Sequence, residues 1–261
     1  MNKPADVHAR IDLRAEILRR SWLFSDLSPD KLPELAAVSV FRRFSKGEII
    51  FRQGDPPDFL YIIGSGRVKQ FKTSPSGKAF TTAVNSPGDP LSVAAVFPGK
   101  AHFVATQAMS DVSAVYVTRK DFLAYVDKYP VVLTRIVHTL GLIINSAYER
   151  LSDLAGETAS QRVLNILYML YFKFGSSVSF TREEIADLAG TRPETTTRVL
   201  AKLKSVGIIR SRRGGVDILD VEKLREVSRG SYLIRLKDID AWKGLAACQN
   251  SNAPDLPSNV I

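Results

Sequence analysis

A strongly basic stretch runs from residue 192 to residue 213. Seven of its 22 residues are Lys or Arg and Glu194 is the only acid, so the stretch has a net charge of +6. Such a charge density is typical of a surface that follows the phosphates of a nucleic acid, because each neutralised phosphate releases a condensed counterion. The alternative is a solvated helix face beside a charged turn. The elements that position these charges decide between the two.

Two helix-start signals lie ten residues apart in this region. Thr181 and Glu184 form a T-x-x-E capping box, and Thr191 and Glu194 form another. In a capping box a hydroxyl accepts from the third helical N–H, and the carboxylate reaches back to the N–H of the cap. Gly190 lies where a left-handed residue would close the first helix. The spacing predicts one short helix between the two boxes.

A second helix is predicted from Arg192 to about Ser205, and Gly207 ends it. Its buried side chains are expected to be Val199, Leu200 and Leu203. A basic two-stranded hairpin follows, up to residue 219. This order is typical of a helix-turn-helix with a wing, and it favours DNA binding over a merely solvated face. The residues expected to contact the DNA backbone carry a hydroxyl or a positive charge: Thr181, Thr191, Arg192, Thr195, Lys202, Lys204, Arg210, Arg212 and Arg213.

The whole chain has 261 residues, a formal charge of +9 and a pI near 9.6. This length allows two domains. Cys248 is the only cysteine, which excludes a disulfide within the chain and a cysteine-ligated iron–sulfur cluster. The N-terminus lacks the apolar core of a signal peptide and no run approaches 18 apolar residues, so no membrane span is expected. We expect a cytoplasmic protein.

Before the basic stretch, the pattern of apolar residues changes from helical to that of short strands and then back to helical. Residues 1–10 are expected to fray, residues 11–27 suit a helix, and Ser28-Pro29 starts a short helix to about Ala37. A series of short strands follows, separated by Gly, Pro, Ser and Asp turns. They are Val38–Phe44, Glu48–Phe51, Phe59–Ile63, Gly66–Phe71, Ala79–Val84, Phe103–Ala108 and Val112–Thr118. This spacing predicts a small antiparallel barrel or roll, whose interior is filled or holds one small ligand.

A long helix is predicted from Pro130 onward. Apolar residues recur along it at steps of three and four, in a heptad-like seam. They are Ile136, Leu140, Ile143, Ala147, Leu151 and Leu154. The seam could pack on the roll of its own chain, but we favour a dimer interface, since a helix-turn-helix that reads a two-fold site needs a dimer. Residues 154–157 are the expected hinge.

The predicted fold class is therefore α+β in four parts. Residues 1–128 form an antiparallel β-roll sensor domain with N-terminal helices, and residues 129–155 form a dimerisation helix and hinge. Residues 156–230 form a winged helix-turn-helix, built on a scaffold helix from Ser160 to about Phe174 and closed by a short helix after Asp220. Residues 231–261 form an extension, in which 234–242 could be a strand or helix and the end is disordered.

No set of residues suggests catalysis. The chain shows no Ser-His-Asp set, no phosphate-binding glycine loop and no pair of catalytic carboxylates. A cupin-like metalloenzyme would need several His and a carboxylate around a metal, and the roll contains only His102. We expect a protein that is not an enzyme.

The sequence resembles the CRP/FNR family of bacterial transcription regulators from about residue 22 to residue 228. The resemblance rests on K-G-E-I-I-F-R-Q-G-D at 46–55, Y-I-I-G-S-G-R-V-K at 61–69, P-G-D at 87–89, and G-T-x-P-E-T-x-T-R at 190–198. It implies a homodimer whose partners are double-stranded DNA and RNA polymerase.

The resemblance also implies the residues that read bases. The family uses a Glu and an Arg four residues apart, which here are Glu194 and Arg198. Glu can accept from cytosine N4, and Arg can donate two hydrogen bonds to guanine. Thr197 stands where FNR-like members carry a small polar residue, and Pro193 replaces a second Arg of the cyclic-AMP type. We therefore expect an inverted repeat close to TTGA-N6-TCAA.

The effector side departs from the cyclic-nucleotide pattern of the family. Val93 stands in place of the Glu that holds the ribose, and His102-Phe103 in place of the Arg-Ser pair that holds the phosphate. We expect no ordinary cyclic-AMP binding, since a buried phosphate needs charge-assisted hydrogen bonds. Three alternatives stay open: a haem ligated by His102 that senses nitric oxide or carbon monoxide, a small organic effector in an apolar pocket, or a filled roll. In the last two, His102 is a hydrogen-bonded residue at the rim. The apolar pocket would be lined by Val93, Val96, Phe97 and Phe103.

Overall fold

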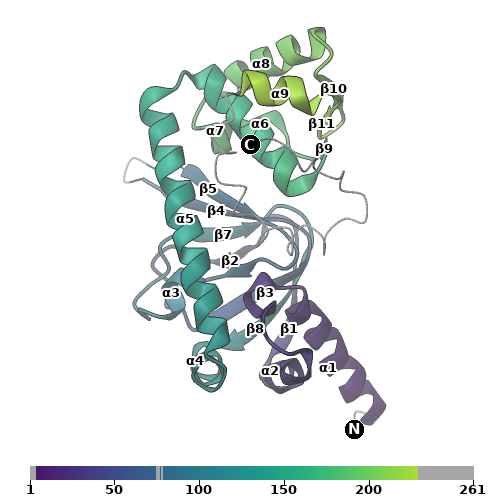
Figure 1. Cartoon of the computed structure of the whole chain (residues 1–261), viewed down its shortest axis with the longest axis vertical. Helices are drawn as coiled ribbons and strands as arrows, with labels where there is room; N and C mark the ends of the chain where they lie inside the picture. The colour runs from purple at the N-terminus through teal and green to yellow at the C-terminus, as the bar shows by residue number, and fades with distance from the viewer. Residues whose placement is uncertain (1–3, 75–76, 78, 229–261) are drawn as a thin grey trace, which may run out of the picture. The chain divides into compact units, whose positions relative to one another are not determined.

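The computed structural model describes residues 4–74, 77 and 79–228. It divides into two compact units, residues 1–144 and 145–261, and most helices and strands of each unit are labelled in Figure 1. The division falls inside the long helix α5 (Val131–Gly156). The expectations for residues 231–261 lie outside the described residues.

The N-terminal unit begins with helix α1 (Pro4–Arg19). The expected fraying of residues 1–10 is therefore wrong for residues 4–10, where a proline at the first helical position suits a helix start. Short helical turns follow at Trp22–Phe24 and Pro29–Lys31, and helix α2 covers Leu32–Val38. The predicted start at Ser28-Pro29 is confirmed, with Ser28 as the cap residue.

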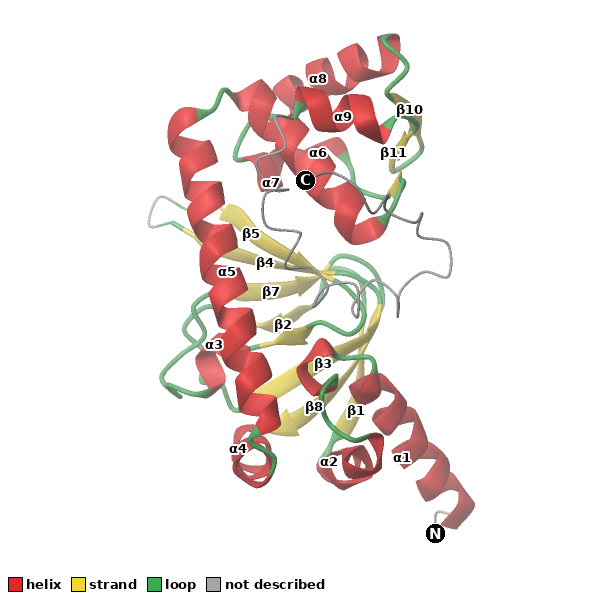
Figure 2. Cartoon of the chain, in the orientation of Figure 1, coloured by secondary structure: helices red, strands yellow, loops and turns green. Residues whose placement is uncertain are grey.

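Among the described residues of the N-terminal unit, eight strands form two antiparallel sheets of four strands each, drawn in yellow in Figure 2. In spatial order, the first sheet contains β1 (Val40–Phe44), β8 (Val112–Thr118), β3 (Phe59–Ser65) and β6 (Pro90–Leu91), and the second contains β2 (Ile49–Phe51), β7 (Ala105–Ala108), β4 (Val68–Thr73) and β5 (Ala79–Asn85). The predicted antiparallel roll is confirmed. The short strand β6 was not predicted, because two residues give no readable alternation.

The first sheet is buried on both faces. Along β3, Tyr61 and Ile63 belong to the core between the two sheets, whereas Leu60 and Ile62 pack against the surrounding helices. Successive side chains of a strand point to opposite faces, so this near-continuous apolar run serves two cores. Helix α4 (Arg119–Lys128) and the first turns of α5 contribute to the helical side.

Helix α5 is a single helix of 26 residues. Its most apolar 18-residue window has a mean hydropathy of 1.3 and is 11% buried, so by length and composition alone it could cross a membrane. The sequence predicts no membrane span, because no uninterrupted run of apolar residues approaches 18. Since one helix of this kind is weak evidence for a membrane span, the question is what covers its exposed apolar side chains.

The described part of the C-terminal unit contains four further helices and a small sheet. They are α6 (Ala159–Phe174), β9 (Ser177–Val178), α7 (Arg182–Ala189), α8 (Pro193–Ser205), β10 (Ile209–Arg212), β11 (Gly215–Ile218) and α9 (Val221–Val227). The wing is more than the predicted two-stranded hairpin, because β9 pairs with β11 as a third strand. Helix α5 continues through Gly156, so the chain breaks at residues 157–158 rather than along the expected hinge at 154–157.

Candidate nucleic-acid interface

The first predicted capping box is present at the start of α7. The Glu184 N–H donates to the Thr181 hydroxyl at 3.2 Å, and the Thr181 N–H donates to the Glu184 carboxylate at 2.8 Å. Gly190 closes this helix in the left-handed conformation, with φ 59° and ψ 40°. Both predictions are confirmed. The sequence could predict them because each feature depends on residues within one turn of each other.

The second predicted capping box is wrong. Helix α8 begins at Pro193, and its cap residue is Arg192, which is extended at φ −98° and ψ 151° and makes no side-chain cap hydrogen bond. Pro193 explains the difference, since proline favours the first helical position and holds its predecessor in an extended conformation. Glu194 thus lies in the second helical position, and its carboxylate is not used for capping.

Helix α8 presents two oppositely charged side chains to solvent. Glu194 and Arg198 are both exposed, and neither has an ion-pair or hydrogen-bond partner within the described part of the chain. Thr197, beside Arg198, is half-buried. The opposite face holds Val199, Leu200 and Leu203, which are buried as predicted. Side chains four residues apart lie on one helix face, so Glu194 and Arg198 can approach the same base pairs.

The residues expected to contact phosphates differ in their exposure. Arg192, Lys202, Lys204, Arg210 and Arg213 are exposed, whereas Thr191, Thr195 and Arg212 are half-buried. The Thr181 hydroxyl is already part of the capping box. It also hydrogen-bonds the Glu183 carboxylate, where it adds to the backbone hydrogen bond that lowers the pKa of Glu183.

Arg212 is held inside the wing rather than offered to DNA. Its guanidinium donates to Asp217 at 3.0 Å and also binds the hydroxyl of Ser179. Arg210 lies 3.2 Å from the same Asp217 carboxylate, but its side chain is 69% exposed. Desolvation raises the pKa of Asp217, yet the hydrogen bonds and charges of the two arginines and Ser177 outweigh it and lower that pKa. Asp217 therefore stays ionised and attracts both guanidinium groups.

Replacing Asp217 by asparagine should strengthen binding to DNA of any sequence. The change releases Arg210 and Arg212 to bind phosphates, so the slope of log K against log salt should steepen by about one per added contact. Fluorescence anisotropy with an unrelated duplex at several salt concentrations measures this slope. Asp220→Asn is the matched control, because it removes the same charge from a partner of Lys223. Equal slopes for the two variants would contradict the expectation.

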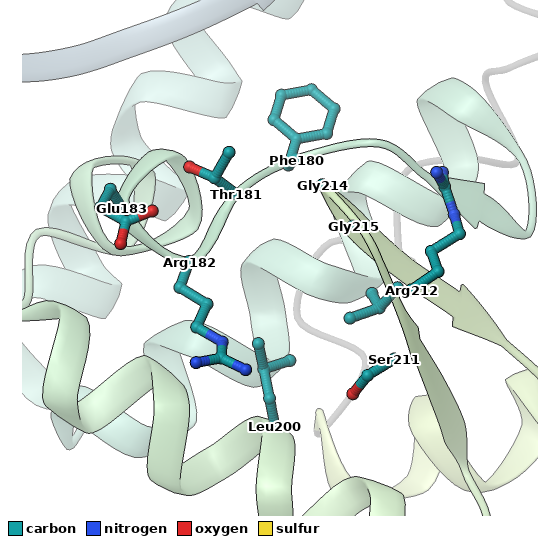
Figure 3. Close-up of a pocket in the computed structure, with 10 residues that line it drawn as sticks. Phe180, Thr181, Arg182, Glu183, Leu200, Ser211, Arg212, Gly214 and Gly215 are labelled. Carbon is teal, nitrogen blue, oxygen red and sulfur yellow. The ribbon is translucent and has the colours of Figure 1, made fainter.

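A cavity of about 240 Å³ lies between the start of α7, helix α8 and the wing. Figure 3 shows the Arg182 side chain extending toward Leu200, while Arg212 points away from them. Arg182 is exposed and was not among the predicted backbone contacts. Its place directly after the Thr181 cap, where helical N–H groups attract anions, makes it a further candidate for a contact with phosphate.

His102 is buried in the roll, with 5% of its surface exposed. Its ring stacks on Phe51 at a centroid distance of 3.8 Å, and its Nδ1 lies 3.4 Å from the Ser92 hydroxyl. Burial lowers the pKa of His102, although the carboxylates of Asp55 and Asp58 act in the opposite direction. The imidazole is therefore neutral near pH 7 and carries no fixed charge for a phosphate.

The other predicted effector residues are divided between the core and the surface. Phe103 is wrong as a lining residue, since 54% of its surface is exposed to solvent. Val93 and Val96 belong to the core that surrounds Phe122, with Phe97 packed against it. They lie in or beside the short helix α3 (Val93–Val96), which follows Ser92 in a left-handed conformation. A turn of this kind directs apolar side chains into the core, which the sequence pattern could not show.

The predicted seam of α5 also needs correction. Ile136 is 1% exposed and packs in the core of its own chain. For Ile136, the alternative that the helix packs on the roll of its own chain is therefore correct. Leu140 is half-buried, whereas Ile143, Ala147 and Leu151 are exposed. The exposed apolar residues continue the heptad spacing through Val137, Ile144, Tyr148 and Leu151.

No group of three or more His, Cys, Asp or Glu side chains that could hold a metal ion is found among the described residues.

Comparisons with known proteins agree with this order of elements. The model of the cyclic nucleotide-binding domain matches residues 41–129, and that of the Crp-like helix-turn-helix domain matches residues 161–227. The Cyclic AMP receptor protein of Thermus thermophilus is 30% identical over 216 residues, which are 82% of this chain and 99% of that protein. The Transcriptional activator protein Anr of Pseudomonas protegens is 28% identical, over 77% of this chain and 85% of that protein.

Among solved structures, FixK2 from Bradyrhizobium japonicum is similar in fold, with a TM-score of 0.67 at 22% identity over 73% of this chain and 97% of that one. A cyclic-nucleotide-type roll, a long helix and a winged helix-turn-helix together define a class of DNA-binding transcription regulators. The chain belongs to the CRP/FNR family within that class.

Proposed function

We propose that this chain is a homodimeric, sequence-specific regulator that binds an inverted repeat close to TTGA-N6-TCAA. One observation carries the proposal: Glu194 and Arg198 lie exposed and unpaired on one face of α8, within the described residues. Arg offers the two donors that match guanine N7 and O6, and Glu accepts from cytosine N4. Pro193 supplies no third base contact, which supports a half-site of the FNR type that contains TGA.

Selection from a pool of random duplexes tests this site. The full-length protein should enrich two TGA-containing half-sites in inverted orientation, since each protomer of a symmetric dimer reads one half. Enrichment of an unrelated motif would contradict the proposed site. A pool without any enrichment would contradict sequence-specific binding itself.

The exposed apolar face of α5 supports the dimer. Val137, Ile144 and Leu151 are spaced by seven residues, with exposed fractions of 62%, 56% and 62%. A heptad repeat of this kind pairs with the same face of a second helix, and such pairing covers surface that would otherwise remain in water. A dimer thus accounts for the apolar composition of α5 without a membrane. A cytoplasmic regulator with RNA polymerase as a partner fits this function.

The regulatory signal is proposed to be something other than cyclic AMP. The relative from Thermus thermophilus is named for that ligand, but here Val93 lies in the core and His102 is neutral and stacked on Phe51. A phosphate held in a protein interior needs charge-assisted donors. The stacking of His102 on Phe51 does not discriminate for or against haem ligation, because an axial bond is made in the ring plane. A small organic effector would need space that Val93, a buried core residue, now fills. The structure thus favours neither alternative.

Isothermal titration calorimetry with cyclic AMP should therefore give no binding heat at micromolar concentrations. The absorption spectrum of the gently purified protein checks the haem alternative in the same preparation. Saturable binding of cyclic AMP in the micromolar range would contradict the proposed signal, while it would leave the DNA-binding function unaffected.

A further inference from the structure

Two arginines from different helices bind the last carbonyl groups of α7. Arg150 of α5 donates to the Leu188 carbonyl at 2.6 Å. Arg162 of α6 donates to the carbonyls of Ala189 and Gly190 at 2.9 and 3.2 Å. The final carbonyls of a helix have no partner within the helix, and a cation there also interacts favourably with the helix dipole. The turn that leads into α8 is thus held from two sides.

A buried polar chain connects the same helices. Asn165 of α6, which is 1% exposed, donates to the Asp153 carboxylate of α5 at 3.0 Å. Gln161 donates to the Asn165 side chain at 3.1 Å and to the Val227 carbonyl at the end of α9 at 2.9 Å. Such a network is stable only while its members keep their partners. It therefore fixes the last turns of α5 against α6.

The position of α8 depends directly on the end of α7. Only residues 190–192 separate the two helices, and Gly190 is locked in the left-handed conformation. Glu194 and Arg198 lie in the first two turns of α8, where a small shift of the helix start moves both side chains. Base recognition requires side chains held to within roughly 0.5 Å of their productive positions.

We infer that Arg150, Asp153, Arg162 and Asn165, here called the α5–α7 clamp, are positioning residues for DNA recognition. They set the recognition helix relative to the last turns of α5, and so determine which spacing between half-sites the dimer accepts. None of the four lies on the exposed face of α8. The inference rests on the proposed function, since spacing has a meaning only for a dimer that reads two half-sites.

Arg150→Met is the best test of the clamp. It keeps the aliphatic stem and removes the hydrogen bond to Leu188, whereas Arg162 binds three carbonyl groups, those of Glu157, Ala189 and Gly190. Arg135→Met is the matched control, because it removes the same charge from the same helix, where the guanidinium pairs with Asp26. Arg150→Lys restores a donor near the Leu188 carbonyl and serves as a rescue variant.

The measurement is fluorescence anisotropy of the full-length proteins with three duplexes. They carry the half-sites selected by the wild-type protein, with the selected spacer or with one base pair more or fewer. In Arg150→Met, affinity for the selected spacing should fall by about tenfold, and the preference over the other spacings should fall by a similar factor. The salt slope should not change, because no phosphate contact is lost. Arg135→Met should behave as the wild-type protein, and Arg150→Lys should recover part of the preference.

Two results would overturn this inference but leave the proposed function unaffected. One is a spacing preference in Arg150→Met equal to that of a selective wild-type protein. The other is a loss of affinity that is the same for all spacings and follows a loss of thermal stability, which would mark a merely structural role. A wild-type protein without any spacing preference would contradict the proposed dimeric function as well. If Arg150→Met does not fold, Asp153→Ala, which removes the acceptor of the Asn165 hydrogen bond, provides the second variant, with the same criteria.

Discussion

Replacing Arg198 by alanine should reduce affinity for the selected DNA site by about 1–3 kcal/mol, because a bidentate contact with guanine is lost. The guanidinium is exposed and has no partner within the described residues, so its removal should leave the fold intact. Selectivity for the one base pair that Arg198 reads should relax, while preferences at the other positions remain. Anisotropy titrations with the selected duplex and its single-base variants measure both effects.

Lys202→Ala is the control for Arg198→Ala. Lys202 lies one turn further along α8, exposed and basic, and it is expected to contact phosphate only. Its removal should weaken binding to all duplexes alike and reduce the salt slope by about one. If Arg198→Ala instead behaves in this uniform manner, Arg198 is not a base-reading residue.

Replacing Ile144 by glutamate should dissociate the dimer and produce the largest loss of DNA affinity. Ile144 is 56% exposed in one chain and lies between Val137 and Leu151 in the heptad. In a paired seam the two introduced carboxylates would be desolvated and would repel each other. Since two linked half-site contacts can exceed one by about 10²- to 10⁴-fold, a monomer should lose affinity of that order.

Sedimentation velocity and DNA titration together check this expectation. Ser146→Glu is the matched control, because Ser146 is exposed on α5 but lies outside the heptad positions. It should remain dimeric and keep its DNA affinity. An Ile144→Glu protein that stays dimeric would show that another surface forms the dimer, and the assignment of the seam would then be wrong.

The parts of the fold that could be predicted from the sequence depend on neighbouring residues. The capping box at Thr181, the left-handed Gly190 and the buried face of α8 are each specified within one or two helical turns. The prediction of a second capping box at Thr191 is wrong, although it also depends on neighbouring residues. Pro193 favours the first helical position, so α8 begins there and Thr191 does not cap it.

The remaining errors involve partners that are distant in the sequence or invisible to a pattern. The sequence shows Arg212 only as one of the basic residues of the wing. The structure shows that its guanidinium is bound by Ser179 and Asp217. Ile136 fits a heptad as well as Val137 does, and only the position of the roll shows which of them is buried. The four residues of the α5–α7 clamp come from two helices, and only Arg150 and Arg162 bind the end of a third, so no spacing in the sequence connects them with α7.

The central claim is tested most directly by one comparison of affinities. The wild-type protein is titrated into a duplex that carries TTGA-N6-TCAA, and into a duplex of the same length and composition in which both TGA triplets are scrambled. At physiological salt the first should bind at least about 10³-fold more tightly, as expected for specific over non-specific recognition. Equal affinities for the two duplexes would contradict the account.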